Sequence, residues 1–322
     1  MRSIPGLIRP KAGGRPRRQR QETLVLLGLV ALLAIIPAIL SPAFRTSQNV
    51  SNILNQIAPI GFVALGQTLP ILTKGIDLSV GPLVSLTTVL AATLMGFDTS
   101  SVLTGLLICL AVGLAVGLVN GFITAYLSVP PLIATLGTMS VVNGVALMVL
   151  PYPGGYVPRP FTQAMLGRIG DVVPYSFVYF AVAALLMTWV MSSTRFGRRV
   201  YAVGGHEERA RVAGINVRAV LMGVYVLSSL FATLGGLALA ARMYSGDPTA
   251  GNPFTMTSVA AVLIGGTTFE GGRGGIPGTV LGVFVIGLLP VSLNLLGVSP
   301  FIQDIVSGAI VVLAGLYSSL RK

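Results

Sequence analysis

The side chains that could carry out covalent chemistry are few in this sequence. There is one histidine, His206, and one cysteine, Cys109, and the cysteine lies inside an apolar run. This composition excludes a His/Cys metal cluster and an internal disulfide, and it leaves a Ser-His-Asp triad one candidate base. The lysines, Lys11, Lys74 and Lys322, stand in no Walker A phosphate-binding motif. We therefore expect no catalytic residue, no metal and no cofactor bound by this chain.

Three asparagines, Asn120, Asn143 and Asn294, lie inside apolar runs. If these runs cross a membrane, each amide has to find hydrogen bonds away from lipid. Such a residue either joins two helices or lines a path for a polar solute. Joining helices is the commoner role.

Asp77 stands at the start of another apolar run. An aspartate at the centre of a spanning helix costs about 2.5–3.5 kcal/mol, so it usually has a partner or a function. Lys74, three positions earlier, is a candidate partner. We favour a structural role, in which Asp77 caps the following helix and Gly75 and Gly81 form the turn, over direct contact with a substrate.

The composition predicts which elements hold these residues. Of the 322 residues, 53% are hydrophobic and only 9% are charged, whereas soluble chains carry about 25% charge. A spanning helix needs roughly 20 apolar residues, and such runs fill most of the chain. We predict an all-α polytopic membrane protein with a basic tail at 1–23 and one transmembrane domain at 24–322. The expected ten spans are 24–41, 50–72, 78–97, 102–127, 131–151, 174–192, 219–241, 254–268, 277–296 and 301–319.

The distribution of lysine and arginine predicts the orientation in the membrane. With both termini in the cytoplasm, 17 of the 21 basic residues lie inside, seven of them in the tail and six in the 193–218 loop. The outside set is Arg45, Arg159, Arg168 and Arg242. Because positive loops stay cytoplasmic, this split favours the orientation chosen and an even number of spans. The net charge of +12 then reflects topology, and a nucleic-acid-binding tail is the alternative.

The 193–218 segment is the longest polar stretch between predicted spans. Residues 206–213 predict a short helix with Glu207 and Glu208 in its first turn, where the helix dipole favours anions. Gly214 suits its C-terminal stop. The segment is either a solvated connector or a docking helix for a cytoplasmic partner.

A second unusual loop runs from Gly265 to Gly278, where seven of the fourteen residues are glycine. It is too flexible for a helix interior. Its arginine, Arg273, places it on the cytoplasmic side in the predicted topology.

Two segments 170 positions apart share the pattern Asp-x-Ser/Thr-x-Gly. They are 77–81 and 247–251, and further identities follow at a spacing of 169, including Gly113 with Gly282 and Pro131 with Pro300. In the predicted topology the first copy begins inside and the second outside, which corresponds to an inverted repeat, a common transporter architecture. Chance recurrence in a sequence rich in Gly, Leu and Val is the alternative.

With these motifs in view, the chain resembles the permease subunits of bacterial ABC sugar importers of the ribose and xylose type. The broad family also contains branched-chain amino-acid permeases. The resemblance covers nearly the whole chain from about residue 24. Its most specific segment is Gly-Ile-Asp-Leu-Ser-Val-Gly, with Gly75, Asp77, Ser79 and Gly81. The other motifs are residues 131–137, residues 251–267, and Gly272-Arg273-Gly274-Gly275.

The resemblance implies a permease that translocates a monosaccharide or similar small polar solute across the bacterial inner membrane by alternating access. ATP with magnesium would bind a separate ABC ATP-binding subunit, a periplasmic sugar-binding protein would deliver the solute, and a second permease copy or homologue would complete the channel. The 193–218 loop resembles the coupling segment, which favours docking to the ATPase. The coupling residues are then Gly205, His206, Glu207, Glu208, Arg211 and Gly214, and the path candidates are Gln67, Thr68, Asn120, Asn143 and Asn294.

The sequence departs from the family pattern at several positions. His206 stands where the family has the better N-cap asparagine, and Lys74 stands where glycine is common. Phe254 and Met256 replace the usual Tyr and Leu. The alternatives are a permease for branched-chain amino acids or nucleosides, and a secondary transporter driven by an ion gradient.

Overall fold

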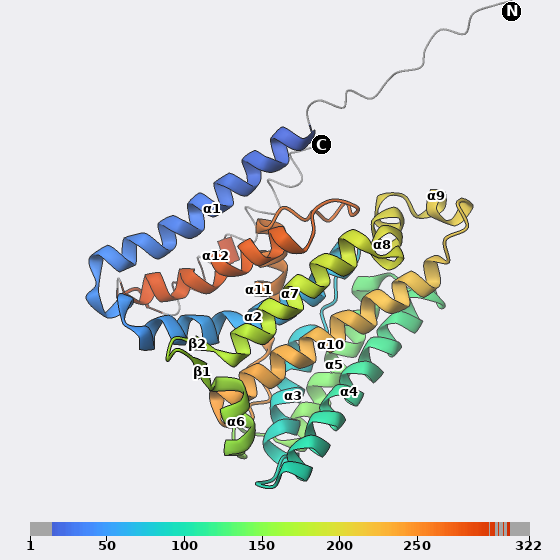
Figure 1. Ribbon diagram of the computed structural model, residues 1–322. Coiled ribbons are helices and arrows are strands. Elements are labelled where there is room, and N and C mark those ends of the chain that lie inside the picture. The colour runs from blue at the N-terminus through green and yellow to red at the C-terminus, as the bar shows by residue number, and fades with distance from the viewer. Residues whose placement is uncertain (1–14, 296, 300–301, 303–304, 306–307, 310–322) are drawn as a thin grey trace, which may run out of the picture.

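The computed structural model describes residues 15–295, 297–299, 302, 305 and 308–309, and this part of the chain is a bundle of helices (Figure 1). Seven helices are 19 residues or longer. They are α1 (Arg15–Leu40), α2 (Ser47–Leu72), α4 (Thr99–Ala125), α5 (Pro131–Val149), α7 (Tyr175–Ser193), α10 (Val217–Met243) and α12 (Ile276–Leu295).

The remaining elements are short. Two apolar helices, α3 (Val80–Leu94) and α11 (Asn252–Ile264), lie within the bundle. The connectors contain η1 (Pro42–Arg45), α6 (Arg159–Leu166), α8 (Arg195–Gly205), α9 (Glu207–Val212) and the strands β1 (Arg168–Ile169) and β2 (Val173–Pro174). The strands pair antiparallel, with Arg168 opposite Pro174.

Nine of the ten predicted spans coincide with a helix, while most of the tenth, 301–319, lies outside the described residues. Six described helices are long and apolar enough to cross a membrane, namely α1, α4, α5, α7, α10 and α12. Helix α2 is long, but five of its first ten residues carry amides. The all-α polytopic membrane fold is therefore confirmed, and the count of ten stays a prediction. The eighth span is short, as expected.

Helix α10 lies at the centre and packs against α2, α3 and α4. Three glycines of α4 face it at a spacing of four residues, and they let the two backbones approach closely. A Cβ atom on Gly117 would lie 2.7 Å from the Cα atom of Val226, and one on Gly121 would lie 2.7 Å from the sulfur of Met222. This glycine spacing on α4 therefore serves helix packing.

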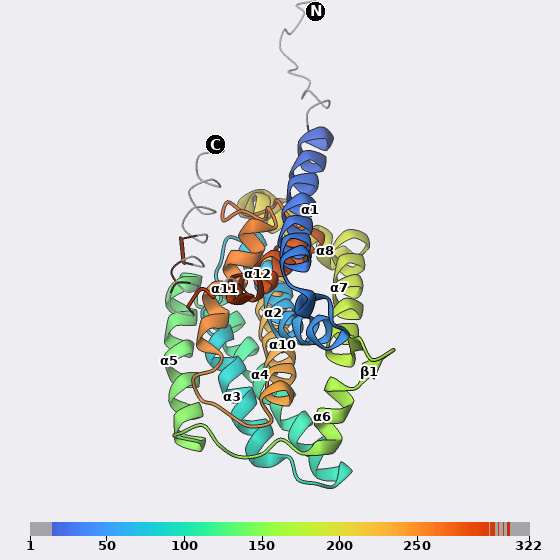
Figure 2. The same ribbon diagram turned by 90° about the vertical axis from the view of Figure 1, so that its left-hand side faces the viewer.

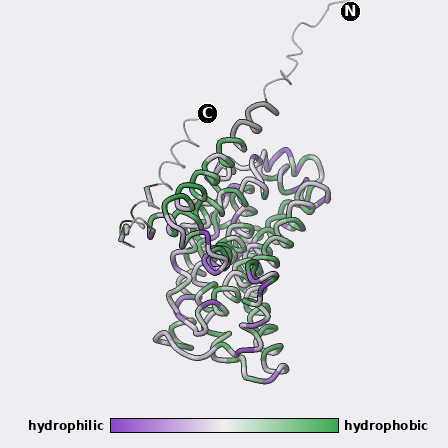
Figure 3. Tube along the Cα trace, turned by 60° about the vertical axis from the view of Figure 1, so that its left-hand side comes forward, coloured by the Kyte–Doolittle hydropathy of each residue, from purple (hydrophilic) through white to green (hydrophobic). Residues whose placement is uncertain are grey.

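The outer helices turn apolar side chains away from the bundle. Figure 2 shows α5 and α7 on opposite flanks. Val182, Leu185 and Trp189 of α7 are 58%, 72% and 59% exposed, which suits contact with lipid. Hydrophobic green dominates the helical tube in Figure 3, and hydrophilic purple is prominent toward the end that holds α8 and α9.

The two ends of the bundle carry different elements. Helices α8 and α9 lie at the upper right of Figure 1, and α6 with the β1–β2 pair lies at the lower left. At the α6 end, Arg168 Nη1 donates a hydrogen bond of 2.7 Å to Gln48 Oε1 at the start of α2. Arg168 and the 193–218 arginines thus occupy opposite ends, as the predicted topology requires.

Candidate functional site

A buried polar cluster surrounds Asp77 in the connector between α2 and α3. Ser79 donates to Asp77 Oδ1 through its backbone N, at 3.0 Å, and through its Oγ, at 2.6 Å. Ser228 of α10 donates to Oδ2 at 2.9 Å, and Asn120 Nδ2 of α4 lies 3.5 Å from Oδ1. All four side chains have no exposed surface. The carboxylate is therefore satisfied by neutral donors from three parts of the chain.

The cluster extends through Asn120 to α5. Asn120 Nδ2 donates to Ser79 Oγ at 2.8 Å, and its Oδ1 accepts a bond of 2.6 Å from Thr138. One turn earlier on α5, Thr135 donates to the carbonyl oxygen of Ile76 at 3.1 Å. Asn120 therefore joins α4 to α5 and to the connector.

The other path candidates lie apart from this cluster. Thr68 is buried and its Oγ1 lies 2.9 Å from Thr279 Oγ1 of α12. Gln67 is fully buried, yet neither amide atom has a hydrogen-bond partner among the described residues. Asn143 has a buried, unpartnered Oδ1, and Asn294 is exposed. Of the five candidates, Asn120 is the one that hydrogen-bonds within the Asp77 cluster.

The second copy of the Asp-x-Ser/Thr-x-Gly motif has the same local geometry. Asp247 Oδ1 accepts from Thr249 N at 2.7 Å and from Thr249 Oγ1 at 2.8 Å. The two motif glycines also meet. A Cβ atom on Gly81 would lie 2.9 Å from the Gly251 carbonyl oxygen, and one on Gly251 would overlap the Gly81 carbonyl oxygen. Corresponding residues therefore contact each other reciprocally.

The predicted coupling segment forms two helices at one end of the bundle. His206 is the N-cap of α9 and makes no side-chain cap bond. Glu207 accepts a 2.9 Å salt bridge from Arg211 four residues later, and Gly214 ends the segment with φ +80°. The expected short helix is confirmed, while α8 was not predicted. Glu207, Glu208 and Arg211 are exposed.

The end of α8 meets the end of α2 and the loop between α11 and α12 through backbone atoms. A Cβ atom on Gly204 would overlap the carbonyl oxygen of Leu72, at the end of α2, and would lie 2.8 Å from Gly272 N. The same Leu72 oxygen accepts a hydrogen bond of 2.9 Å from Gly272 N in the loop from Gly265 to Gly278, which we call the glycine loop. We call this contact of residues 72, 204 and 272 the three-way junction. Its closeness requires glycine at position 204.

Lys74 lies beside the three-way junction and not beside the carboxylate proposed as its partner. Its Nζ is 3.5 Å from the Gly205 carbonyl oxygen, and within the described part of the chain it forms no ion pair or hydrogen bond with Asp77. The suggested Lys74–Asp77 pair is therefore wrong. Lys74 has φ +65°, a conformation that glycine adopts without strain.

The glycine loop contains no helix between α11 and α12, as its composition predicts. Gly272 and Gly274 have φ values of +66° and +99°. Arg273, between them, is exposed. Tyr201 of α8 donates to the Gly274 carbonyl oxygen at 3.1 Å, so the loop is attached to the coupling segment at a second point.

Several residues of the site were missed from the sequence. Ser228, Thr138 and Thr279 supply hydrogen bonds to predicted residues from distant positions. Tyr225 is 1% exposed, and a Cβ atom on Gly75 would lie 2.5 Å from its hydroxyl. Small polar residues are common in membrane helices, so their presence in apolar runs was no distinguishing signal.

Residues 49–315 match the family described as the permease component of the branched-chain amino acid transport system. The chain belongs to this family. Two relatives are import permeases for sugars. The ribose import permease of Bacillus subtilis (strain 168) is 43% identical over 88% of this chain and 89% of its own length. The galactose/methyl galactoside import permease of Escherichia coli (strain K12) is 35% identical over 91% of this chain and 92% of its own length. A probable ABC transporter permease of the same E. coli strain is 41% identical over 92% and 89%. No solved structure matches this permease.

Replacing Asp77 by alanine should destabilise the permease far more than the same change at Asp247. Asp77→Ala leaves buried donors on Ser79 and Ser228 without their acceptor, which costs about 3 kcal/mol. Asp247→Ala removes the acceptor of the exposed Thr249 only, and should lower the free energy of unfolding by about 1 kcal/mol or less. Denaturant unfolding in mild detergent measures both. Equal losses would contradict the structural role of the Asp77 cluster.

The three-way junction predicts opposite outcomes for two neighbouring glycines. Gly204→Ala places a methyl group against backbone that cannot rotate away and should destabilise the permease by about 2 kcal/mol. Gly205→Ala meets no atom within 4 Å and should leave stability nearly unchanged. Thermal unfolding of both variants in the same detergent compares them directly. A stable Gly204→Ala variant would show that the three-way junction is looser than described.

Proposed function

We propose that this permease is the membrane subunit of an ATP-driven importer that carries a monosaccharide or a similar small polar solute by alternating access. The supporting observation is its identity of 35–43% with ribose and galactose import permeases over about nine-tenths of each chain. The family match over residues 49–315 includes every described candidate span after α1. On this proposal the permease catalyses no covalent step and binds no ATP or magnesium itself.

The polar interior fits a neutral solute. Asp77 already accepts from Ser79 and Ser228 and is not available as a charged anchor. The unpartnered amide of Gln67 is the strongest candidate for the path, because a buried amide without hydrogen bonds is costly unless another state supplies a partner. A sugar hydroxyl or a water molecule has the right chemistry. Thr68, Asn143 and Asn294 remain candidates for the same path.

The exposed charges of α9 support docking to a cytoplasmic ATP-binding subunit. Glu207, Glu208 and Arg211 are exposed, and the nearby Gly204 is packed closely against α2 and the glycine loop. Movement of α9 would therefore be transmitted to both. The proposal places the protein in the bacterial inner membrane with both termini cytoplasmic, and adds a periplasmic sugar-binding protein and a second permease copy or homologue as partners.

We propose further that ten spans arise from an inverted repeat. Three pairs of helices share an offset of 170 residues at one end. Helices α2 and α10 begin at 47 and 217, α3 and α11 end at 94 and 264, and α4 and α12 end at 125 and 295. Helices α2 and α10 run antiparallel, since Gly66 meets Ser228 while Gly235 meets Pro59. The reciprocal contact of Gly81 and Gly251 suits a pseudo-two-fold axis through this point.

The family description also supports a branched-chain amino acid as the alternative solute. A zwitterionic substrate would require a charged partner in the path. The described interior offers Asp77, which is already hydrogen-bonded on both oxygens. The sugar proposal is therefore favoured over the amino acid. The sugar import permeases and the probable ABC transporter permease among the relatives favour it over a nucleoside and over transport driven by an ion gradient.

Uptake by reconstituted vesicles tests the solute. The permease, its co-purified ATPase and the binding protein are placed in liposomes loaded with ATP and magnesium, and uptake of labelled ribose, galactose, leucine and a nucleoside is compared. ATP-dependent uptake of one of the sugars is expected. Leucine or nucleoside uptake would replace the sugar proposal, and uptake in ATP-free vesicles under an ion gradient would replace the ABC mechanism.

Co-purification tests the docking surface. Changing Glu207, Glu208 and Arg211 together to alanine should remove the ATPase from the purified permease by loss of contact charges, without unfolding the bundle. Arg199→Ala is the control, because this arginine is exposed on α8 outside α9. Retention of the ATPase by the triple variant would place the docking site elsewhere.

A further inference from the structure

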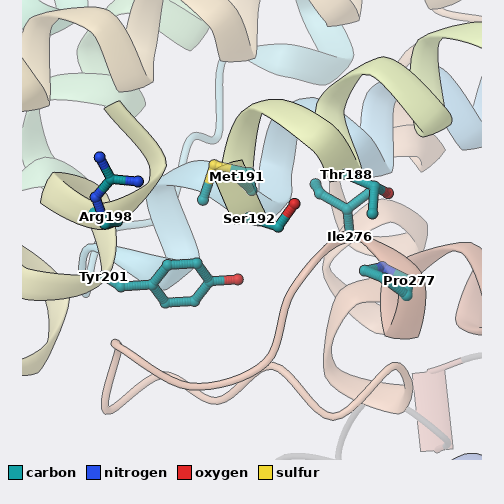
Figure 4. Close-up of a pocket in the computed structure, with 7 residues that line it drawn as sticks. All are labelled: Thr188, Met191, Ser192, Arg198, Tyr201, Ile276 and Pro277. Carbon is teal, nitrogen blue, oxygen red and sulfur yellow. The ribbon is translucent and has the colours of Figure 1, made fainter. Parts of the chain in front are cut away.

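A cavity of about 460 Å³ lies outside the site described above, where the end of α7, helix α8 and the start of α12 meet. Figure 4 shows its lining side chains gathered from these three elements. Met191 and Ile276 are buried at 3% and 0% exposure and give it an apolar wall. The other lining residues are Thr188, Ser192, Arg198, Tyr201 and Pro277.

The residues around this cavity on α7 and α8 indicate where it lies relative to the membrane surface. Leu185, three residues before Thr188 and so on the same helix face, is 72% exposed. Trp189, the sole tryptophan of the chain, is 59% exposed one turn before the helix ends, and tryptophan is enriched at the membrane–water interface. Arg198 and Arg199, both exposed, follow on α8. The cavity therefore lies between the lipid-facing surface and the basic end of the molecule.

The polar groups of the cavity leave one strong donor for an incoming ligand. The hydroxyls of Thr188, Ser192 and Tyr201 donate to the carbonyl oxygens of Ala184, Trp189 and Gly274. Burial raises the pKa of the Tyr201 hydroxyl, so it stays neutral. Arg198 Nη1 donates to the Ser193 carbonyl oxygen at 3.0 Å.

That backbone bond holds the Arg198 guanidinium in place but uses only one of its five N–H groups. Among the described residues, Arg211 pairs with Glu207, and Arg198 has no carboxylate partner. A positive charge fixed over an apolar cavity is matched by a ligand with an anionic head and an apolar body.

We propose that this cavity binds an anionic phospholipid, with its phosphate on Arg198 and an acyl chain beside Leu185 on α7. The apolar wall of Met191 and Ile276 favours a lipid over a soluble phosphate. Basic pockets between spanning helices on the cytoplasmic side suit anionic headgroups. A lipid bound there contacts α7, α8 and α12 at once and braces the coupling segment. The inference requires that the chain spans a membrane and does not depend on the transported solute.

Native mass spectrometry of the full-length permease in mild detergent, titrated with phosphatidylglycerol, tests the site. We expect one tightly bound lipid per chain, and about tenfold weaker binding in Arg198→Gln, since an Arg–phosphate contact contributes about 1.5 kcal/mol. Ser192→Phe fills the cavity without changing charge and should weaken binding similarly. Arg199→Gln, with the same charge change outside the cavity, should bind like wild type. Each variant is compared only if its thermal midpoint without lipid equals that of wild type.

Three outcomes would overturn the proposal. Equal weakening in Arg198→Gln and Arg199→Gln would indicate diffuse attraction to the basic end. Equal affinity for phosphatidylcholine would indicate an apolar groove without headgroup recognition. Displacement of the lipid by millimolar glycerol phosphate would indicate a site for a soluble phosphate. If Arg198→Gln does not fold, the proposal is tested with the Ser192→Phe variant alone. Binding of phosphatidylglycerol to Ser192→Phe with unchanged affinity would then refute the cavity as the lipid site.

Discussion

The buried Asp77 carboxylate has to find hydrogen-bond donors inside the bundle, and much of the arrangement follows from this requirement. An unsatisfied polar group in an apolar interior costs several kilocalories per mole. Ser79 supplies two donors locally, but the second oxygen depends on Ser228 of α10. Asn120 of α4 joins the same cluster and passes the connection to Thr138 of α5. The cluster therefore fixes which faces of α4, α5 and α10 meet.

Glycines allow close helix packing at the places where two backbones lie directly against each other. In lipid, helices gain little from apolar burial against each other, so close backbone approach provides much of their attraction. Gly113, Gly117 and Gly121 bring α4 onto α10, and Gly81 and Gly251 bring α3 onto α11. Hydrogen bonds select the contacts, and the glycines allow the close approach that makes those bonds short.

Local patterns in the sequence predicted the elements well and their mutual contacts poorly. Hydropathy located nine described helices, and the charges, His206 and Gly214 located α9 within a residue or two. Helix α8 was missed, although Val200 and Val203 are buried opposite exposed arginines, because the adjacent glycine pair dominated the interpretation. The partners of Asp77 were missed for a different reason. Ser228 is 151 positions away, and nothing in a local window distinguishes it from its neighbour Ser229.

The short connector from Thr73 to Ser79 takes part both in the buried hydrogen bonds and in the close backbone contacts. At one end Lys74 lies against Gly205, just before α9, and Leu72 accepts the hydrogen bond of Gly272. At the other end Asp77 is held by α10 and α4. Between them Gly75 packs against the hydroxyl of buried Tyr225. This connector therefore links the residues next to α9 with the buried cluster, and through that cluster with the helices that Asp77 holds together. On the proposed function, a displacement of α9 would be transmitted along it.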